Sequence, residues 1–387
     1  MDYAIFGLTL LGIAFFHDRA LLVALAGLTA VVVLQIALAP SPVGVTTYQT
    51  VEHFVDEWVI LTNLFLLLLG FAALSSHFEY SGLPEAIPAR LPDGWMGGVV
   101  LLALVFLLSI FLDNIAGAVI GGVAARHVFP RGITVGFLAS IVSAANAGGA
   151  GSVIGDTTTT MMWLRGISPL EVLPAFVGAL AAFAVFAPFA AIAQHRTFPF
   201  VRPDISHLRI DWKRVCIVVF VLATLVTINV VANSSFPQHE EFAPVLGLGL
   251  WAAILISAPL RAPDWAMIQG AFKGSVFLVV LVALASLMPI ENLPEPSTTT
   301  VFGLGVLSAV FDNIPLTALA LNQGGYDWAL LAYAVGFGGS MVWFGSSAGV
   351  ALSNLFPQGR SVFAWLREGW FVPLSYVVGF LAMFAAS

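Results

Sequence analysis

The chain has 387 residues, of which 59% are hydrophobic and only 9% are charged, and its mean hydropathy is +0.98. This composition excludes a water-soluble globular protein and predicts a polytopic membrane protein without a separate soluble domain. The formal net charge of -7 excludes little, because in a membrane protein the location of the charges is informative rather than their sum. The single cysteine, Cys216, excludes an intramolecular disulfide and a multi-cysteine metal site.

Apolar runs of about 20 residues, which cross roughly 30 Å of hydrocarbon as a helix, recur along the whole chain. We expect helices throughout, because lipid offers exposed backbone groups no hydrogen-bond partner. In chain order the simple spans are predicted at 3–16, 20–39, 57–78, 171–195, 214–232, 242–260, 264–288 and 369–386. The first run lacks a basic region before it and a small-residue cleavage site after it, so we expect a retained span rather than a signal peptide.

Four further apolar segments are interrupted. Residues 96–129 and 298–324 are each broken near the middle by the dipeptide Asp-Asn, and we interpret them as re-entrant hairpins. Residues 136–164 and 328–356 are each broken by glycines and polar residues, and we interpret them as broken helices. Counting the broken helices, the sequence predicts about ten transmembrane helices and two re-entrant hairpins.

Basic residues sort to one side of this arrangement, which the positive-inside rule identifies as the cytoplasm. That side carries Arg19, Arg90, Arg126, Arg131, Arg196, Arg202, Arg209, Lys213, Arg214, Arg261, Arg360 and Arg367. The opposite loops carry Glu52, Asp56, Glu240, Glu241, Glu291 and Glu295. Arg165 is the one basic exception on that side, and Lys273 lies inside a span. Both termini are therefore predicted to lie outside.

Two halves of the chain resemble each other at the polar breaks. "FLDNIAGA" (111–118) matches "VFDNIPLTA" (310–318), and "GGAGSVIGD" (148–156) matches "GGSMVWFGS" (338–346) with the glycines in register. Each half contributes five crossings and one hairpin, an odd number, so the second half is predicted to be inverted. The sequence thus predicts one repeat over 1–195, a cytoplasmic linker over 196–213 and a second repeat over 214–387.

Inverted repeats with paired, interrupted segments are typical of secondary transporters, whose binding sites form at the midplane where the breaks meet. An unwound helix exposes N–H groups that attract anions and C=O groups that attract cations, and glycines let backbone approach a ligand closely. The candidate binding residues are Asp113, Asn114, Asn146, Gly148, Gly149, Gly155, Asp156, Thr157, Thr158, Asp312, Asn313, Gly338, Gly339, Ser340, Gly345, Ser346 and Ser347.

Each of these features also has a purely structural interpretation. Asp113, Asp156 and Asp312 can serve as helix N-caps, and glycines at helical spacing often permit close helix packing. However, a carboxylate at this depth costs at least about 2.5–3.5 kcal/mol on insertion scales, whereas serine or threonine caps a helix nearly as well. The three aspartates therefore indicate function, and we expect them to be the ligands of sodium or of a metal carried with a substrate.

The sequence argues against an enzyme. No histidine falls within the candidate site, which disfavours a catalytic zinc or haem. No base and nucleophile occur at a recognisable spacing. A channel is also disfavoured, because hairpins that enter from opposite faces leave no continuous pore. We expect no cofactor, only transported or coupling ions: sodium, protons or a citrate-bound metal.

The motifs "FLDNIAGA", "NAGGAGSVIGDTTTTMMW", "FDNIPLTALA" and "GGSMVWFGSSAGVA" resemble the ion-transporter superfamily. This superfamily includes NhaD-type sodium/proton antiporters, citrate and metal-citrate carriers, dicarboxylate/sodium symporters and arsenite permeases; the motifs are most similar to the NhaD type. The resemblance implies a scaffold that forms a homodimer and a transport domain that moves as an elevator. In the dicarboxylate branch the hairpin tips read Ser-Asn-Thr. Here they read Asp-Asn-Ile, which argues against transferring dicarboxylate specificity.

Two transport functions fit the sequence. A sodium/proton antiporter needs acidic groups that bind sodium when ionised and a proton otherwise, which suits the three aspartates. A carrier of citrate, or of its metal complex, also needs neutral hydrogen-bond donors, which the asparagines, threonines and serines supply in larger number than bare sodium requires. The number of donors favours a citrate-type organic-anion carrier coupled to sodium or protons, with the antiporter as the alternative. Either would be an integral protein of the bacterial inner membrane that contacts lipid and no nucleic acid.

Overall fold

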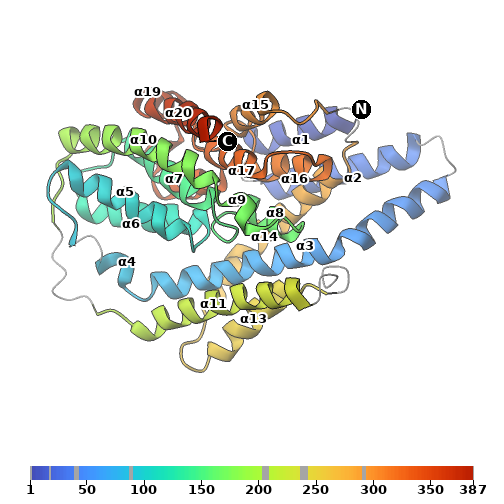
Figure 1. Ribbon diagram of the computed structural model, residues 1–387, viewed down its shortest axis with the longest axis horizontal. Coiled ribbons are helices and arrows are strands. Elements are labelled where there is room, and N and C mark those ends of the chain that lie inside the picture. The colour runs from blue at the N-terminus through green and yellow to red at the C-terminus, as the bar shows by residue number, and fades with distance from the viewer. Residues whose placement is uncertain are drawn as a thin grey trace. The chain divides into compact units, whose positions relative to one another are not determined.

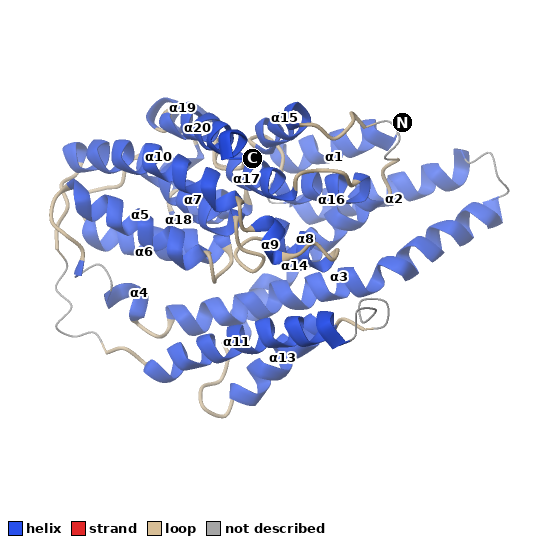
Figure 2. Cartoon of the chain, viewed as in Figure 1, coloured by secondary structure: helices blue, strands red, loops and turns tan. Residues whose placement is uncertain are grey.

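The computed structural model describes residues 2–16, 19–38, 43–86, 90–202, 209–235, 243–289 and 293–386. Every regular element within these ranges is a helix (Figure 2), as the composition predicts for a chain that must satisfy its backbone in lipid. The chain forms two compact units, and each draws on both halves of the sequence.

One unit comprises Met1–Ser76, Cys216–Leu293 and Ala318–Gln323. Its helices are α1 (Asp2–Phe15), α2 (Ala20–Leu38), most of α3 (Val43–Glu79), most of α11 (Trp212–Ser235), α13 (Val245–Ser257) and α14 (Trp265–Ser286) (Figure 1). Helix α2 packs on both α1 and α14. The amide oxygen of Asn63 accepts a 2.9 Å hydrogen bond from the Gly247 backbone N–H, so a polar side chain ties α3 to α13.

The other unit comprises His77–Val215, Pro294–Thr317 and Gly324–Ser387. Its first part contains α4 (Leu83–Ala86), α5 (Trp95–Ser109), α6 (Asn114–Val128), α7 (Val135–Ala150), α8 (Thr157–Leu164), α9 (Pro169–Val172) and α10 (Ala175–Thr197). Its later part contains α15 (Thr298–Ser308), the start of α16 (Asn313–Gln323), α17 (Trp328–Gly338), α18 (Ser347–Leu355), η4 (Pro357–Arg360), α19 (Val362–Glu368) and α20 (Phe371–Ala386).

Helices α7 and α17 form the core of this second unit. All residues of α7 are buried, as are residues 329–338 of α17, so both helices are enclosed around their whole circumference, as is typical of a central helix. Helix α5 packs on α7, α15 packs on α17, and α7 and α17 pack on each other. The first helices of the two broken segments therefore lie at the centre of the unit.

The interrupted segments fold as helix pairs. The segment predicted as 96–129 forms α5 and α6, which pack together around a turn at residues 110–113. The segment predicted as 298–324 forms α15 and α16, and the broken helices become α7 with α8 and α17 with α18. Which of these elements enter and leave on the same side of a membrane stays a prediction.

The simple spans agree with the helices to within a few residues, with one clear exception. Helix α3 begins at Val43, although the span is predicted from residue 57. The acidic side chains of Glu52 and Asp56 lower the hydropathy of 43–56 but do not interrupt helical hydrogen bonding, and no Pro or Gly follows Gly44 in that stretch. The resulting helix of 37 residues is about 55 Å long, which exceeds the hydrocarbon thickness.

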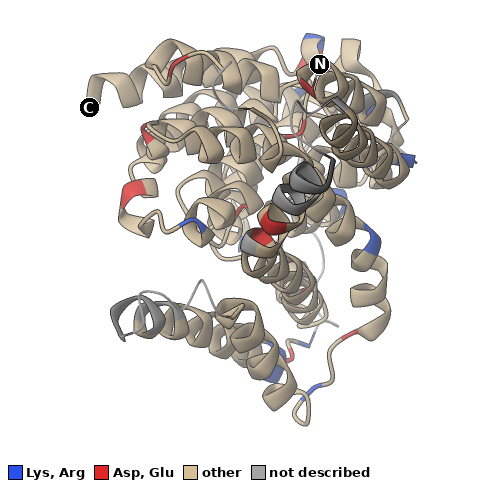
Figure 3. Cartoon of the chain, turned by 90° about the vertical axis from the view of Figure 1, so that its right-hand side faces the viewer, with Lys and Arg blue, Asp and Glu red and all other residues tan. Residues whose placement is uncertain are grey.

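Four helices in the described chain are long and apolar enough to cross a membrane, at Ala20–Ala37, Glu57–Glu79, Pro169–Thr197 and Trp265–Ser286. The pair Val362–Glu368 and Phe371–Ala386, bent by 62°, makes a fifth if it counts as one span. Six shorter apolar helices of 10–17 residues add to these, and charged side chains are sparse along the ribbon (Figure 3). These features describe an integral membrane protein, whereas the count of about ten spans stays a prediction.

Short elements that hydropathy does not predict complete the second unit. Helix α9 begins with a capping box formed by Ser168 and Glu171, so the span predicted from 171 starts at Ala175 instead. Likewise η4 and α19 precede the last helix. All are too short to show a helical hydrophobic period.

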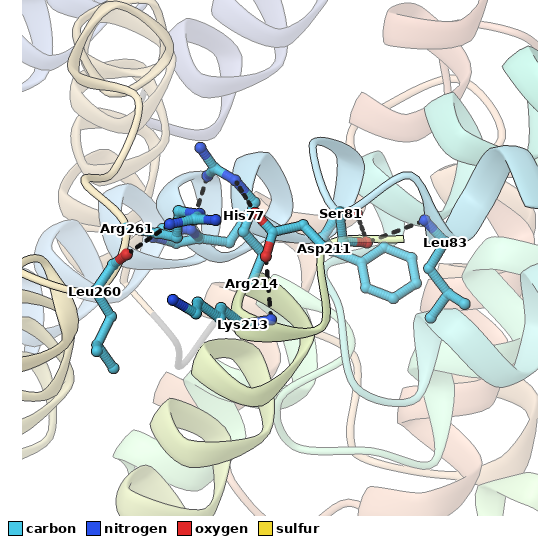
Figure 4. Close-up of polar contacts among 9 residues, drawn as sticks. His77, Ser81, Leu83, Asp211, Lys213, Arg214, Leu260 and Arg261 are labelled. Carbon is cyan, nitrogen blue, oxygen red and sulfur yellow. Dashed lines mark hydrogen bonds and ion pairs between the residues drawn. The ribbon is translucent and has the colours of Figure 1, made fainter. Parts of the chain in front are cut away.

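The chain passes from one unit to the other after Ser76 and after Val215, and residues on the second-unit side of both points contact one another (Figure 4). The Arg214 guanidinium lies 3.1 Å from His77 Nδ1. Because arginine can only donate, His77 accepts at Nδ1. The guanidinium also lies 5.6 Å from the centre of the Tyr80 ring, and the Asp211 N–H donates to the Ser81 carbonyl at 2.8 Å.

Replacing Arg214 tests how much this junction contributes to stability. Arg214→Ala removes a charged donor and a cation–π contact and leaves a buried imidazole nitrogen unpaired, at a cost of about 1–3 kcal/mol. We expect a lower melting temperature in detergent. Lys213→Ala, in the exposed neighbouring residue, should melt as the wild type does; equal melting of both variants would contradict the assignment.

Candidate functional site

Both breaks in the central helices end in a capped helix start. Asp156 Oδ1 accepts from the Thr158 backbone N–H at 2.9 Å, and Ser346 Oγ accepts from the Gly349 N–H at 3.3 Å. In the first break, the Thr159 hydroxyl donates to the Ser152 carbonyl at 2.6 Å. These bonds satisfy donors and carbonyls that an interrupted helix leaves without partners, so the breaks are defined structures rather than unravelled helix.

The two hairpin tips differ although both read Asp-Asn. Asp312 Oδ1 accepts from the Ile314 N–H at 3.0 Å and its Oδ2 accepts from the Ser347 hydroxyl at 3.1 Å. Asp113 occupies the same N-cap position before α6, but its side chain makes no capping hydrogen bond. Capping thus accounts for part of the bonding of Asp156 and Asp312 and leaves Asp113 unexplained.

Asn146 links the two broken helices. Its Oδ1 accepts from Asn114 Nδ2 at 3.0 Å, and its own Nδ2 donates to Ser340 Oγ at 3.0 Å and to Ser346 Oγ at 3.2 Å. Asn114 Nδ2 also donates to Asp156 Oδ2 at 3.0 Å. The structure therefore joins five predicted site residues, from one hairpin tip and both breaks, in a single buried network.

Asp312, Ser347 and Asn313 form a second group at the other hairpin tip. The Ser347 bond to Asp312 joins this tip to the start of α18, while Asn313 is only 2% exposed. The hydrogen bonds of the described residues do not connect this group to the network around Asn146. Thr157 is buried at the start of α8 and belongs to neither group.

The predicted glycines allow close packing at matching places. A Cβ on Gly148 or on Gly338 would fall on a backbone carbonyl, that of Phe106 in α5 or of Gly305 in α15. A Cβ on Gly149 would lie 2.6 Å from the Gly155 carbonyl, and one on Gly339 would lie 2.7 Å from that of Gly345. These residues let helices and breaks pack backbone to backbone; a direct part in ligand binding stays a prediction.

Among the residues that the structure describes, none of the three aspartates has a basic partner. Within the described residues no ion pair involves Asp113, Asp156 or Asp312, and the charge on Asp156 repels those on the other two. Asp156 is only 2% exposed. In the part of the chain that the structure describes, no three His, Cys, Asp or Glu side chains could hold one metal ion together, so the aspartates do not form a single three-carboxylate site.

Four buried polar atoms near the breaks have no hydrogen-bond partner among the described residues: Ser109 Oγ, Asp113 Oδ1, Thr158 Oγ1 and Asn313 Nδ2. Buried polar groups are normally paired, so atoms of this kind often await a ligand, an ion or water. All four flank the hairpin tips or the first break, and three of them belong to residues that the sequence predicts for the site, Asp113, Thr158 and Asn313.

Sequence reasoning missed Ser109 and Trp365. Ser109 has a detectable signal, because "LSIFLDN" (108–114) and "LSAVFDN" (307–313) place a serine four residues before each aspartate. Trp365 donates from Nε1 to the Ser340 carbonyl at 3.0 Å and holds the second break from α19. Nothing in the sequence around Trp365 indicates that contact.

Replacing Gly338 tests the packing role of the matched glycines. In Gly338→Ala the methyl group overlaps the Gly305 carbonyl, and because backbone cannot move aside as a side chain can, we expect a loss of about 1–3 kcal/mol or more in stability. The measurement is the melting temperature of the purified protein. Gly303→Ala, where a Cβ meets nothing within 4 Å, is the control; a normal Gly338→Ala melting curve would refute the interpretation.

Comparison with known families places the chain among membrane transporters. The model of a family described as citrate transporter (CitMHS) matches residues 13–338. A sodium/proton antiporter 1 of Arabidopsis thaliana is 28% identical over 340 residues, which cover 76% of this chain but only 57% of that protein.

The alignments with two bacterial relatives cover a larger share of each relative's own length. The Na(+)/H(+) antiporter NhaD of Vibrio parahaemolyticus is 27% identical over 387 aligned positions, which cover 84% of this chain and 89% of that protein. The NhaD of Vibrio cholerae is also 27% identical, with 85% of this chain and 79% of that protein covered. The family match and these relatives agree with the resemblance noted in the motifs.

Proposed function

We propose that this chain, which belongs to the citrate transporter (CitMHS) family, exchanges sodium ions for protons across the membrane in which it lies. Membership of the family follows from its match over most of the chain. It makes the protein a secondary transporter in the membrane and not an enzyme. Sodium and protons are then substrates and coupling ions rather than cofactors.

The observation that carries this proposal is the set of three aspartates without a basic partner. Buried carboxylates are costly unless a cation or a proton neutralises them. Asp113 Oδ1 has no partner within the described residues, and Asp156 Oδ2 accepts a hydrogen bond from the neutral amide of Asn114. A hard monovalent cation prefers oxygen ligands of this kind, and a proton can replace it.

The hydrogen bonds of the site favour this function over citrate transport. The sequence argument for citrate depends on neutral donors, but the side-chain amides of Asn114 and Asn146 already donate to protein acceptors. The Ser347 hydroxyl likewise serves Asp312. A tricarboxylate would have to displace these bonds and approach three aspartates of its own sign.

Citrate remains the second candidate, because the matching family is described as citrate transporter. The unpaired Asn313 Nδ2 is a donor that a carboxylate could use. A metal ion held between the aspartates and citrate would replace their electrostatic repulsion by attraction to the shared cation.

The inverted repeat is part of the proposal. Equivalent glycines support it: Gly148 and Gly338 make corresponding backbone contacts, and so do Gly149 and Gly339. The helix caps Asp156 and Ser346 and the serines before both Asp-Asn tips support it as well. Both tips and both breaks lie in the second unit, which suits a mobile transport domain, while the other unit would be the scaffold of a homodimer. We place the termini outside the bacterial inner membrane, from the distribution of arginines.

Exchange is tested with the full-length protein in liposomes that carry a pH-sensitive dye. We expect external sodium to collapse an imposed pH gradient, while labelled citrate stays at background with and without ferric or divalent metal. Citrate accumulation with an unaffected pH gradient would reject the antiporter and establish the second candidate.

Charge-neutralising variants test the aspartates. Asp113→Asn, Asp156→Asn and Asp312→Asn each remove one charged ligand, worth about 1.5–3 kcal/mol, so sodium-dependent proton movement should fall roughly tenfold to a hundredfold. Asp93→Asn is the matched control, because Asp93 is exposed and pairs with Arg202 at 3.1 Å. Wild-type exchange by all three site variants would reduce the aspartates to helix caps.

A further inference from the structure

Gly336 occupies the place in the second broken helix that Asn146 occupies in the first. The register set by Gly148 with Gly338 and by Gly149 with Gly339 aligns the two positions. Both residues are buried. One repeat thus places an amide at this position that makes three hydrogen bonds, and the other places no side chain at all.

Close packing does not explain Gly336. The glycines of the breaks, Gly148, Gly149, Gly155, Gly338, Gly339 and Gly345, all have a backbone carbonyl where a Cβ would stand. At Gly336 the nearest atoms to a Cβ would be Asp156 Oδ2 at 3.7 Å and Ala150 Cβ at 3.8 Å, which are ordinary contact distances. Alanine would therefore fit there, and it would also be the better helix former.

The space that a methyl group would fill at Gly336 borders on a carboxylate oxygen. Glycine leaves a gap of about one methyl group there, since a Cβ would only reach ordinary contact distance, and a polar wall suits water or a small cation rather than an empty cavity. The wall is Asp156 Oδ2, the atom that also accepts from Asn114. Thr158 Oγ1, in the turn that follows Asp156, is buried and lacks a partner among the described residues.

We infer that Gly336 is a specificity-determining residue, which keeps a space beside Asp156 Oδ2 open for a small monovalent cation. The inference rests on the proposed sodium/proton exchange and adds to it the residue that sets the size of the ion space. A side chain at position 336 narrows that space without disturbing the helix, so it changes which ion binds rather than whether the protein folds.

Gly336→Ala is tested against Gly303→Ala, whose added methyl meets nothing within 4 Å in α15. The measurements on purified protein are the melting temperature, direct binding of sodium and of lithium, and ion-driven proton movement in liposomes. Both variants should melt no lower than the wild type. In Gly336→Ala alone, the affinity for sodium should fall about tenfold, which is about 1.4 kcal/mol, with a smaller loss for lithium, the smaller ion.

Gly336→Ser provides a second variant, since its hydroxyl oxygen can serve as a ligand and should restore part of the sodium affinity lost in Gly336→Ala. Unchanged sodium and lithium affinities in a folded Gly336→Ala protein that still exchanges ions would overturn the inference and leave the exchange function intact. Sodium binding that depends on residue 336 in a protein that moves no protons would instead reject the exchange function and uphold the inference.

Discussion

The cost of burying a negative charge away from water is the constraint on which the functional part of this structure depends. A carboxylate at membrane depth persists only where a cation, a proton or hydrogen bonds compensate it. Asp156 and Asp312 receive hydrogen bonds from their own helix starts, and Asp113 Oδ1 receives none within the described residues. The protein groups therefore compensate the three charges only in part, and the proposed exchange assigns the remainder to a bound ion or a proton.

Around this constraint the two halves of the second unit share packing but differ in chemistry. Glycines at matched positions bring α7 onto α5 and α17 onto α15 through backbone contacts. The side chains at the capping positions are Asp156 in one break and Ser346 in the other, and Asn146 has Gly336 as its counterpart. Similar backbone packing thus holds one break with a charged residue and an amide, and one break with neutral residues. Asn146 of the first broken helix donates hydrogen bonds to Ser340 and Ser346 of the second.

The sequence predicts those parts of the fold that follow from hydropathy and from local helix rules. The breaks after Ala150 and Gly338 and the Asp-Asn tips lie where glycines and polar residues indicate, because lipid-embedded helices tolerate such residues only at interruptions. The start of α3 at Val43 was not predictable in this way, since acidic residues lower hydropathy without ending a helix.

The site was predictable as a set of residues but not as a pattern of bonds. Matched motifs identify Asp113, Asn146 and Asp156, yet no periodicity reveals that Asn114 donates to Asn146 and Asp156, or that Asn146 donates to two serines of the second break. That pairing is a tertiary property, and it shifts the balance from an organic anion toward a cation. The contact of Trp365 with the Ser340 carbonyl is tertiary in the same sense.

The unpaired Asp113 oxygen also has a consequence for how the protein behaves outside its membrane. An ion that binds the folded chain and not the unfolded one stabilises it through mass action, by about 2.7 kcal/mol at a hundred times its dissociation constant. Sodium would then be both cargo and structural support, and a preparation stripped of salt would hold the carboxylates together against their own repulsion. If sodium binds as proposed, the cation in the purification buffer would change the stability of the second unit.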